Sequence, residues 1–402
     1  MKMPPKENSP DRKLRILHVL RAPLGGLFRH VVDLTREQIA RGHAVGLVTD
    51  SLTGGERATQ ILAELEPSLA LGILRLPVPR PPHILDIPAA MRVALHTRAL
   101  RADVVHGHGS KGGLYARLPA FLPGFHAPIR AYTPHGGSFN YQASAPVEAS
   151  LMAAERLLSY ATDIFLFESA YIAKQFRRRV GSTRKLVRLV ANGISPVEFD
   201  PIRSVPDAAE FLYVGELRAA KGIDTLIDAL AMLSAGLARR PRLLLVGTGP
   251  DQGKLAAQAA RRGVADDITF AGLMPAREAF RLGKILVVPS RAESLPYIVL
   301  EAAAAQVPMV ASNVGGIGEI FGPHRDRLIP CDNPAILAAA MQAASERDPQ
   351  ELHQESAALA AFVGTLFTID DMADAVLAGY AAAIGKRSRR RGAPSASFAL
   401  PS

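Results

Sequence analysis

The chain has 402 residues, which at roughly 150 residues per domain suggests two or three domains. Hydrophobic residues make up 48% of the chain and charged residues 21%, a globular composition that argues against disorder along most of its length. The net charge is +10, but five of these units follow residue 385 and two precede residue 14, which leaves +3 for the body. Because the basic runs contain few aromatic residues and the chain has no tryptophan, we expect no nucleic-acid partner.

The cysteine content and the lengths of the apolar runs indicate the cellular compartment. Cys331 is the only cysteine and cannot form an intramolecular disulfide, so the protein needs no oxidising compartment. The first residues are polar, and no run approaches about 18 apolar residues. We therefore expect a cytoplasmic protein, with peripheral association at the inner face of the membrane as an open alternative.

Short apolar runs and longer helical stretches alternate along the chain in two series. The first series of expected strands is Ile16–Leu20, Val45–Thr49, Val104–His106, Ile129–Thr133, Ile164–Phe167 and Leu186–Val190. The second series is Phe211–Val214, Leu243–Val246, Ile268–Phe270, Ile285–Val288 and Met309–Ala311. Helices are expected at about 28–40, 222–235, 250–262, 297–305 and 370–384. This pattern predicts two α/β domains with doubly wound parallel sheets, of the Rossmann-like kind, facing a central cleft.

The composition also predicts the domain boundaries. We expect one domain over residues 14–200 and a second over 207–369, joined by a polar stretch that contains proline. A helix over 370–385 follows, and we expect it to pack back on the first domain. Residues 1–13 and the basic tail 386–402 are poor in apolar residues, which predicts disorder at both ends.

Two glutamates follow the buried strand Ile285–Val288. Glu293 lies in the loop and Glu301 on the next helix, so both carboxylates can project toward one ligand. The backbone N–H groups of Ser294 and Leu295 precede that helix and can face a ligand there. The alternative is that Glu293 is a helix cap and Glu301 a solvated residue, but an unpaired carboxylate in an apolar segment costs several kcal/mol.

A second candidate site follows Phe211–Val214. Lys221 lies at a loop–helix junction, where a cation and the helix N-terminus together suit a diphosphate. Arg218 precedes it in the same loop. The alternative is that both are exposed loop cations.

Three further segments follow expected strands. His135 comes after Ile129–Thr133, between a proline and a pair of glycines, which gives it a restricted, exposed position; a packed or capping histidine is the alternative. Gly25 and Gly26 follow the first strand without completing a GxGxxG fingerprint, so a nicotinamide enzyme is disfavoured. Gly247 begins the loop after Leu243–Val246.

A His-x-His pair, His106 and His108, raises the question of a metal. No cysteine or carboxylate accompanies the pair at ligand spacing, and no Asp-x-Asp occurs in the chain, so we expect no metal. The segment is expected to open a helix, with Lys111 available to an anion.

The stretch Tyr171–Val180 has helical spacing, with Ile172, Phe176 and Val180 on one face among basic residues. The ordinary interpretation is a surface helix whose apolar face packs in the core. The alternative is contact with an anionic membrane, by this helix or by the basic tail.

Taken together, these motifs resemble the retaining glycosyltransferases of the GT-B fold, specifically glycosyltransferase family 4. The Glu-x7-Glu pair and the following PMVASNVGGIGEI carry the resemblance, which extends from about Ile16 to Tyr380. It implies an enzyme that moves a hexosyl group from a nucleotide-diphosphate sugar to an acceptor hydroxyl with retention, without metal or other cofactor. By this resemblance Glu293 contacts the donor sugar and is catalytic, and Glu301 holds the nucleotide ribose.

By the same resemblance, the second domain would bind the nucleotide sugar, and its cations would have roles in that binding. Lys221 matches a family lysine that contacts the donor diphosphate. Glu216 stands where the family usually has arginine, so Arg218 is the candidate substitute. Ser294, Leu295 and Pro296 replace the family's frequent Gly-Phe-Gly, and Pro296 has no N–H to offer.

The first domain would lie on the acceptor side. There, His135 corresponds to a family histidine that faces the donor sugar, and we expect it to stabilise the reacting centre by hydrogen bonding. Gly25 and Gly26 resemble the family's glycine loop near the donor phosphate, and Gly247 resembles its second-domain loop near the nucleotide.

The expected partners are a nucleotide sugar and a glycan or lipid-linked acceptor, in the assembly of a cell-surface polysaccharide or glycolipid. Two alternatives remain open at this point. One is a GT-B-fold nucleotide-sugar epimerase, and the other is a non-catalytic protein that binds nucleotide sugars. The donor, the acceptor, the linkage formed and the oligomeric state also remain open.

Overall fold

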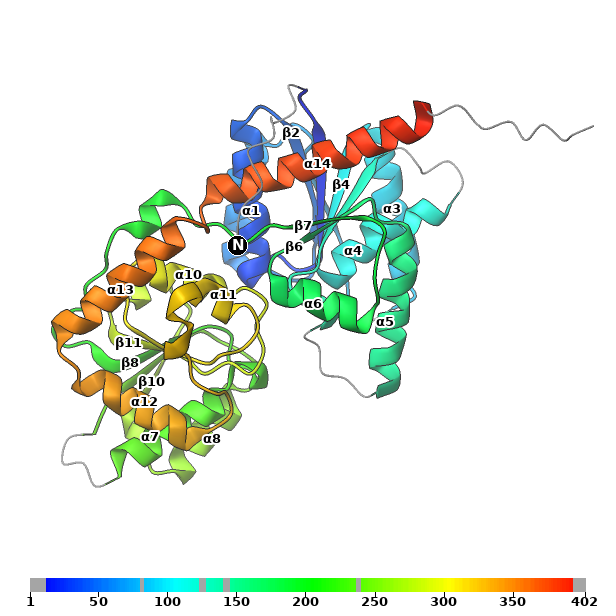
Figure 1. Ribbon diagram of the computed structural model, residues 1–402. Coiled ribbons are helices and arrows are strands. Elements are labelled where there is room, and N and C mark those ends of the chain that lie inside the picture. Colours follow the sequence, from blue (N-terminus) through cyan, green and yellow to red (C-terminus); the bar gives the residue numbers. More distant parts are fainter. Residues whose placement is uncertain (1–11, 80–82, 123–127, 140–144, 236–239, 393–402) are drawn as a thin grey trace, which may run out of the picture. The chain divides into compact units, whose positions relative to one another are not determined.

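A computed structural model describes residues 12–79, 83–122, 128–139, 145–235 and 240–392 of the chain. Its contacts divide the chain into two compact units, which Figure 1 shows in ribbon form. The first unit comprises the chain up to Glu168, Ala173–Val190 and the part from Met372 onward. The second unit comprises Ser169–Ile172 and Ala191–Asp371.

The first unit is built on a seven-stranded parallel sheet with strand order β3-β2-β1-β4-β5-β6-β7. Its strands are β1 (Arg15–Leu20), β2 (Ala44–Asp50), β3 (Ile73–Leu76), β4 (Val104–His108), β5 (Ile129–Thr133), β6 (Ile164–Phe167) and β7 (Leu186–Leu189). Its helices are α1 (Gly25–Ala40), α2 (Gly55–Leu65), α3 (Asp86–Ala99), α4 (Gly109–Arg117), α5 (Ala145–Tyr160), α6 (Ala170–Arg179) and most of α14 (Ile369–Gly392). The expected strands are confirmed, and β3 is an additional strand at the edge of the sheet, where Arg75 is exposed.

Apolar side chains cover both faces of this sheet. On one face, Leu17 of β1 belongs to a cluster with Val93 of α3 and Tyr115 of α4. On the other face, Leu47 of β2 belongs to a cluster with Val31 of α1. Burial of such a side chain contributes about 1.5–3 kcal/mol. The helices therefore hold the strands in place, and the loops at the carboxyl ends of the strands remain for ligand binding.

The second unit repeats this plan on a five-stranded parallel sheet of order β10-β9-β8-β11-β12. Its strands are β8 (Ala209–Val214), β9 (Leu243–Val246), β10 (Ile268–Gly272), β11 (Gly283–Val288) and β12 (Met309–Ala311). Its helices are α7 (Ile223–Ser234), α8 (Gln252–Arg261), α9 (Ala276–Ala279), α10 (Tyr297–Ala304), α11 (Ile317–Phe321), α12 (Pro334–Glu346) and α13 (Pro349–Gly364). Leu286 packs with α10, α11 and α13 on one face, and Val287 packs with α7, α8 and α12 on the other. Each unit therefore has a doubly wound sheet, as the sequence predicts.

The boundary between the units differs from the expected one. Residues from Ala191 onward belong to the second unit, whereas the sequence places them in a domain that ends at residue 200. Ile194 is fully buried and pairs with Thr368 in a parallel bridge. Its N–H donates to Phe367, and its carbonyl accepts from Ile369. This segment joins the second unit because its backbone groups are paired there.

Helix α14, drawn in orange to red in Figure 1, corrects the expected disordered tail over 386–402. The helix continues to Gly392, so the first part of that segment is helical, and residues 393–402 lie outside the described residues. Arg387 forms an ion pair with Asp163 and donates to the carbonyl of Pro128 at 2.8 Å. Cations are favoured at a helix C-terminus, where they complement the helix dipole. A run of basic residues at this position therefore extends a helix.

Candidate functional site

The loops after β8 and β11 bring Lys221 and Glu293 together. Lys221 ends a short 3₁₀ turn, Ala219–Lys221, between β8 and α7. Gly222 follows with a φ of +66°, and a Cβ there would lie 2.0 Å from the carbonyl oxygen of Pro289. Only glycine lets this loop approach the end of β11 so closely. The consequence is that Lys221 Nζ lies 2.6 Å from Glu293 Oε1.

Glu293 is held by more than the lysine. The hydroxyl of Ser290 donates to Glu293 Oε1 at 2.7 Å, and the Glu293 side chain is only 8% exposed. An ammonium group has three N–H donors, so the Lys221 donor used by Glu293 leaves two for an anionic ligand. The arrangement can bind an anion beside a carboxylate that accepts hydrogen bonds from hydroxyl groups.

Arg291 fixes the loop that carries Lys221, a role not evident from the sequence. Its guanidinium donates to both carboxylate oxygens of Asp224, at 2.7 and 2.8 Å, and to the carbonyl of Ala219 at 2.7 Å. It also donates to Asp332 at 2.7 Å. A planar guanidinium suits this two-pronged contact. Arg291 thus connects the end of β11 to the start of α7.

The other predicted residues of the segment with the two glutamates are Glu301, on α10, and Ser294 and Leu295, which precede this helix. Glu301 is half-buried on that helix. Leu295 is buried, and its carbonyl accepts from the side chain of Asn192 at 2.7 Å. The carbonyl of Ser294 accepts from the N–H of Gly316 at 2.8 Å. These bonds order the segment between Glu293 and the helix.

Arg218 has a partner that bears on its predicted role. Its Nε lies 2.9 Å from a carboxylate oxygen of Glu216, the residue that replaces the family's usual arginine. Both side chains are substantially exposed, at 41% and 49%, so this pair is weak and can exchange for another anion. Gly247 begins the loop after β9, and its N–H donates to Gly272 at 2.7 Å.

In the first unit, Gly25, Gly26 and His135 follow parallel strands. Helix α1 begins at Gly25, somewhat before the expected start near Phe28, and Gly25 has a φ of +64° that favours glycine. His135 has a φ of +51°, which is uncommon for a residue other than glycine and costs of order 1–3 kcal/mol. Such strain is found most often at functional sites.

His135 belongs to a cluster of five histidines. Its Nε2 lies 3.0 Å from His108 Nδ1, and His108 Nε2 lies 2.9 Å from His18 Nδ1. The ring of His30 stands edge-on to His135 at 4.6 Å, and the ring of His106 lies 3.9 Å from that of His108. His18 is a polar residue inside an apolar strand, which is the sequence signal that points to it.

Burial controls the charge of this cluster. Desolvation lowers the pKa of His18 to about 4, against a hydrogen bond with Gln38 that raises it. Burial, together with the neighbouring histidines, lowers the pKa of His106, His108 and His135 well below the ordinary value of 6.5. These four rings are therefore neutral near pH 7.

The same cluster bears on metal binding. Ring nitrogens of His18, His106 and His108 lie within 4.8 Å of one another, and so do those of His30, His108 and His135. This spacing could admit a metal ion, but both nitrogens of His18, His106 and His108 already have hydrogen-bond partners. The absence of a metal from the mechanism stays a prediction.

Lys111 is not the available cation that the sequence suggests. It lies on α4, which opens after His108 as expected. Its ammonium forms an ion pair with Asp86, and both side chains are nearly buried. Burial opposes ionisation of Asp86, but hydrogen bonds from Lys111, Tyr115 and the N–H of His83 lower its pKa. Lys111 is committed to this pair because the chain folds α3 against α4.

Helix α6 is a surface helix whose apolar face packs in the core, which is the first of the two interpretations of this stretch. Its apolar residues Ile172 and Phe176, with Val180 just beyond it, are at most 4% exposed. Phe176 packs on the rings of Phe139 and Phe165. These side chains are therefore not available to a lipid surface. Among the helices that the structure describes, none is long and apolar enough to cross a membrane.

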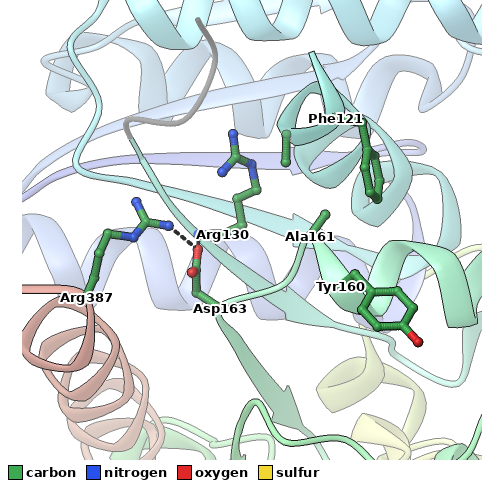
Figure 2. Close-up of a pocket in the computed structure, with 7 residues that line it drawn as sticks. Phe121, Arg130, Tyr160, Ala161, Asp163 and Arg387 are labelled. Carbon is green, nitrogen blue, oxygen red and sulfur yellow. Dashed lines mark hydrogen bonds and ion pairs between the residues drawn. The ribbon is translucent and has the colours of Figure 1, made fainter. Parts of the chain in front are cut away.

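A cavity of about 350 Å³ opens on the first unit at the beginnings of β5 and β6 (Figure 2). It is lined by Ala120, Phe121, Arg130, Tyr160, Ala161, Asp163 and Arg387. Figure 2 shows Arg387 directed at Asp163, whose carboxylate also accepts from the backbone N–H of Arg130 at 2.8 Å. Burial lowers the pKa of Arg130 to about 10, although Asp163 raises it. Because ligands of parallel sheets bind at the carboxyl ends of strands, this cavity lies at the wrong edge to be the predicted site.

The structure thus assembles the predicted residues in two groups. Lys221, Glu293 and Glu301 belong to the second unit, with Arg218, Gly247, Ser294 and Leu295. Gly25, Gly26 and His135 belong to the first unit. Both groups follow the carboxyl ends of parallel strands, where doubly wound sheets bind ligands.

Two family models match the chain, in succession along its length. Residues 24–198 match a model described as Glycosyltransferase Family 4. Residues 208–347 match a model described as Glycosyl transferases group 1.

Relatives of known sequence match most of the chain. It is 28% identical to the glycogen synthase of Mycobacterium tuberculosis (strain ATCC 25618 / H37Rv), over 94% of this chain and 96% of that protein. It is 27% identical to the D-inositol 3-phosphate glycosyltransferase of Streptomyces bingchenggensis (strain BCW-1), over 86% of this chain and 82% of that protein. These names favour sugar transfer over epimerisation.

Solved structures share the fold. The sucrose-phosphate synthase of Thermosynechococcus elongatus superposes with a TM-score of 0.74 at 20% identity, covering 94% of this chain and 99% of that one. The Anabaena protein HepE in complex with UDP-glucose superposes with a TM-score of 0.73 at 16% identity, covering 93% and 100%. The neighbours and the two parallel sheets establish the GT-B fold. The chain belongs to glycosyltransferase family 4, the retaining GT-B family that its motifs resemble, and it transfers sugar from a nucleotide sugar.

Proposed function

We propose that Lys221 binds the diphosphate of the donor and Glu293 orients the donor sugar. The observation that carries this assignment is the 2.6 Å pairing of the two groups at the ends of β8 and β11. In a nucleotide sugar the diphosphate and the sugar are directly bonded, so their binding groups must be neighbours. An ammonium next to a carboxylate meets that requirement.

The rest of the donor is assigned to neighbouring groups. Glu301 holds the ribose hydroxyls, and Gly247 lies near the nucleotide. The N–H groups of Ser294 and Leu295 face the sugar or phosphate, where the dipole of α10 favours negative charge. Arg218 reaches the diphosphate only by exchanging its pair with Glu216, so its contribution is smaller than that of Lys221.

Gly25, Gly26 and His135 act from the first unit, near the donor phosphate and the reacting sugar. As the bond between sugar C1 and the phosphate oxygen breaks, positive charge develops on the sugar and negative charge on the phosphate, and Lys221 stabilises the latter. The acceptor oxygen forms the new bond to C1 on the same face, and its proton passes to the leaving phosphate. Retention therefore needs no enzymic nucleophile.

A UDP-sugar is the first donor to test. HepE was solved with UDP-glucose, and TarM of S. aureus with UDP and α-GlcNAc-glycerol. Similar proteins support a glycan or lipid-linked acceptor, among them WaaG, a glycosyltransferase involved in lipopolysaccharide biosynthesis. We therefore place this enzyme in the assembly of a cell-surface glycan or glycolipid.

Contact with an anionic membrane is assigned to the basic end of α14, because the apolar side chains of α6 are buried. Arg389 is exposed near the end of α14. Clusters of basic residues of this kind bind anionic lipid at about 1 kcal/mol per residue. This contact would place the enzyme at the inner face of a membrane, where lipid-linked acceptors are accessible.

The test is a thermal-stability screen of the purified protein against UDP- and GDP-sugars, followed by transfer assays with glycan and lipid acceptors. A bound donor raises the melting temperature by mass action, and retention is read from the anomeric configuration of the product. Stabilisation by a nucleotide sugar that is lost in Lys221→Met but kept in Lys254→Met supports the assignment. Lys254 is a matched control, because it is 84% exposed on α8. Equal stabilisation of both variants would refute the role of Lys221.

A further inference from the structure

Gln38 is a buried amide on α1 at the end of the histidine chain. Its Oε1 lies 2.8 Å from His18 Nε2, and its side chain is fully buried. The chain continues from His18 to His108 at 2.9 Å and from His108 to His135 at 3.0 Å. A single line of contacts therefore leads from Gln38 to the histidine assigned to the reacting centre.

Each contact in this line needs one proton between its two atoms. An amide oxygen only accepts hydrogen bonds, so His18 Nε2 must carry a proton. A neutral imidazole has one N–H, so His18 Nδ1 accepts and His108 Nε2 donates to it. By the same reasoning His108 Nδ1 accepts from His135 Nε2. The order of donors and acceptors is thus set from the Gln38 end.

Neutrality of these rings is what makes the order unique. A protonated imidazolium donates from both nitrogens and would break the sequence of donors and acceptors. Burial lowers the pKa of His18, His108 and His135, as described above. The rings therefore stay neutral at the pH of the cell.

The surroundings keep the rings in place. His106 lies 2.7 Å from the hydroxyl of Tyr380 and 2.8 Å from that of Thr133, so its two nitrogens are engaged outside the line. Its ring lies tilted against that of His108, with the two ring centroids 3.9 Å apart. At the far end, His135 Nδ1 has no hydrogen bond to any residue in the described part of the chain.

We propose that Gln38 is a positioning residue that fixes the tautomer of His135 through His18 and His108, and leaves His135 Nδ1 as a hydrogen-bond acceptor for a sugar hydroxyl. This role rests on the proposed function of His135. Such an acceptor orients a hydroxyl through its O–H, whereas the other tautomer would present an N–H to the hydroxyl oxygen. Gln38 thus acts on the reaction without touching the substrate.

The direct test is NMR of the ¹⁵N-labelled histidine rings in the purified full-length protein at pH 7.5, since protonated and unprotonated ring nitrogens have distinct shifts. The wild type should show His135 protonated at Nε2 and unprotonated at Nδ1. In Gln38→Met, which has no acceptor oxygen, His18, His108 and His135 should become mixtures of tautomers. Gln38→Glu retains an acceptor oxygen and should preserve the order. Gln342→Met, on the exposed surface of α12, is the matched control.

The kinetic arm uses the same variants. Gln38→Met should lower kcat for transfer about tenfold with little change in the donor KM, and Gln38→Glu should recover most of this loss. Wild-type His135 protonated at Nδ1, or unchanged ring shifts in Gln38→Met, would overturn the proposal. So would a stoichiometric metal in the purified protein whose removal changes these shifts. Full transfer by His135→Asn would refute the proposed role of His135 but leave the tautomer measurement valid, so the two failures are distinguishable.

Discussion

The ammonium group of Lys221 lies 2.6 Å from Oε1 of Glu293, although the two residues are 72 positions apart in the chain. The contact exists because parallel strands β8 and β11 are neighbours in the sheet, so the loops at their carboxyl ends meet. A cation and a carboxylate in this arrangement can bind the two halves of a sugar phosphate.

Removing either member of the pair should impair transfer. We expect Lys221→Met and Glu293→Gln each to lower kcat/KM by at least roughly tenfold, about 1.4 kcal/mol of barrier. Lys221→Met removes the charge that balances the leaving diphosphate, and Glu293→Gln removes a charged hydrogen-bond acceptor. Steady-state kinetics with the best donor from the screen measures both. Near-wild-type turnover in a folded Lys221→Met protein would contradict the assignment.

Arg291 should matter more for donor binding than for stability. Arg291→Lys keeps the charge but loses the two-pronged contact with Asp224, so the loop that carries Lys221 loosens. We expect the donor KM to rise several-fold. The free energy of unfolding should fall by at most about 1 kcal/mol, because Asp224 is 44% exposed.

Arg262→Lys is the matched control for this variant. Arg262 forms an ion pair with Asp228, away from the Lys221 loop, so it should leave the donor KM unchanged. Donor kinetics and urea unfolding of both variants separate the two effects. An unchanged donor KM in Arg291→Lys would show that Arg291 does not order the loop.

The buried histidines should make stability depend on pH. In the unfolded chain they bind protons below about pH 6.5, whereas His18 in the folded protein stays neutral down to about pH 4. Below pH 6.5 the unfolded state therefore binds more protons, and stability falls as the pH falls. The slope is up to about 1.4 kcal/mol per pH unit for each such histidine. Above pH 6.5 this contribution is absent.

Urea unfolding at pH 7.5, 6.5 and 5.5 measures this slope. His18→Gln should reduce this slope by up to about 1.4 kcal/mol per pH unit, the contribution of one histidine, because it removes one depressed pKa. Gln342→Met on α12, outside the cluster, removes no titratable group and is the control that should leave the slope unchanged. Equal stability at pH 7.5 and pH 5.5 would mean that the cluster is already charged in the folded protein.

The basic end of α14 should increase binding to anionic membranes. Deleting residues 388–402 removes Arg389 and the basic residues after it but keeps the ion pair of Arg387 with Asp163. We expect several-fold weaker binding to vesicles that contain anionic lipid, and no change with neutral vesicles. Co-sedimentation measures both. Unchanged binding to anionic vesicles would remove any role for this segment.

Most of the fold could be predicted from local patterns. Runs such as Ile164–Phe167 are apolar on both faces, which is the signature of a buried parallel strand, and the structure has them as expected. The edge strand β3 escaped prediction because Arg75 interrupts its apolar pattern. Helices α12 and α13 are rich in alanine and have weak periodicity, so their presence was less evident. The helical end of α14 differs from the expected disordered tail because a basic run suits a helix C-terminus as well as a disordered segment.

The candidate site was predictable where motif and position agree. Glu293 and Lys221 could be identified because each follows an apolar strand in a segment that resembles the family. Their contact could not, because it depends on which strands are neighbours. Arg291 and Gln38 carry no motif, so only their contacts indicate a role.

The sequence by itself determined the two-domain architecture, the family and the residues that could meet the donor, because strand periodicity and loop motifs are local properties of the chain. The tertiary structure decided which charges remain available. It commits Lys111 to Asp86, pairs Arg218 with Glu216 and gathers four histidines around His108. The physical reason is that burial and partner choice depend on distances in space. Those distances are set by the packing of strands and helices far apart in the sequence.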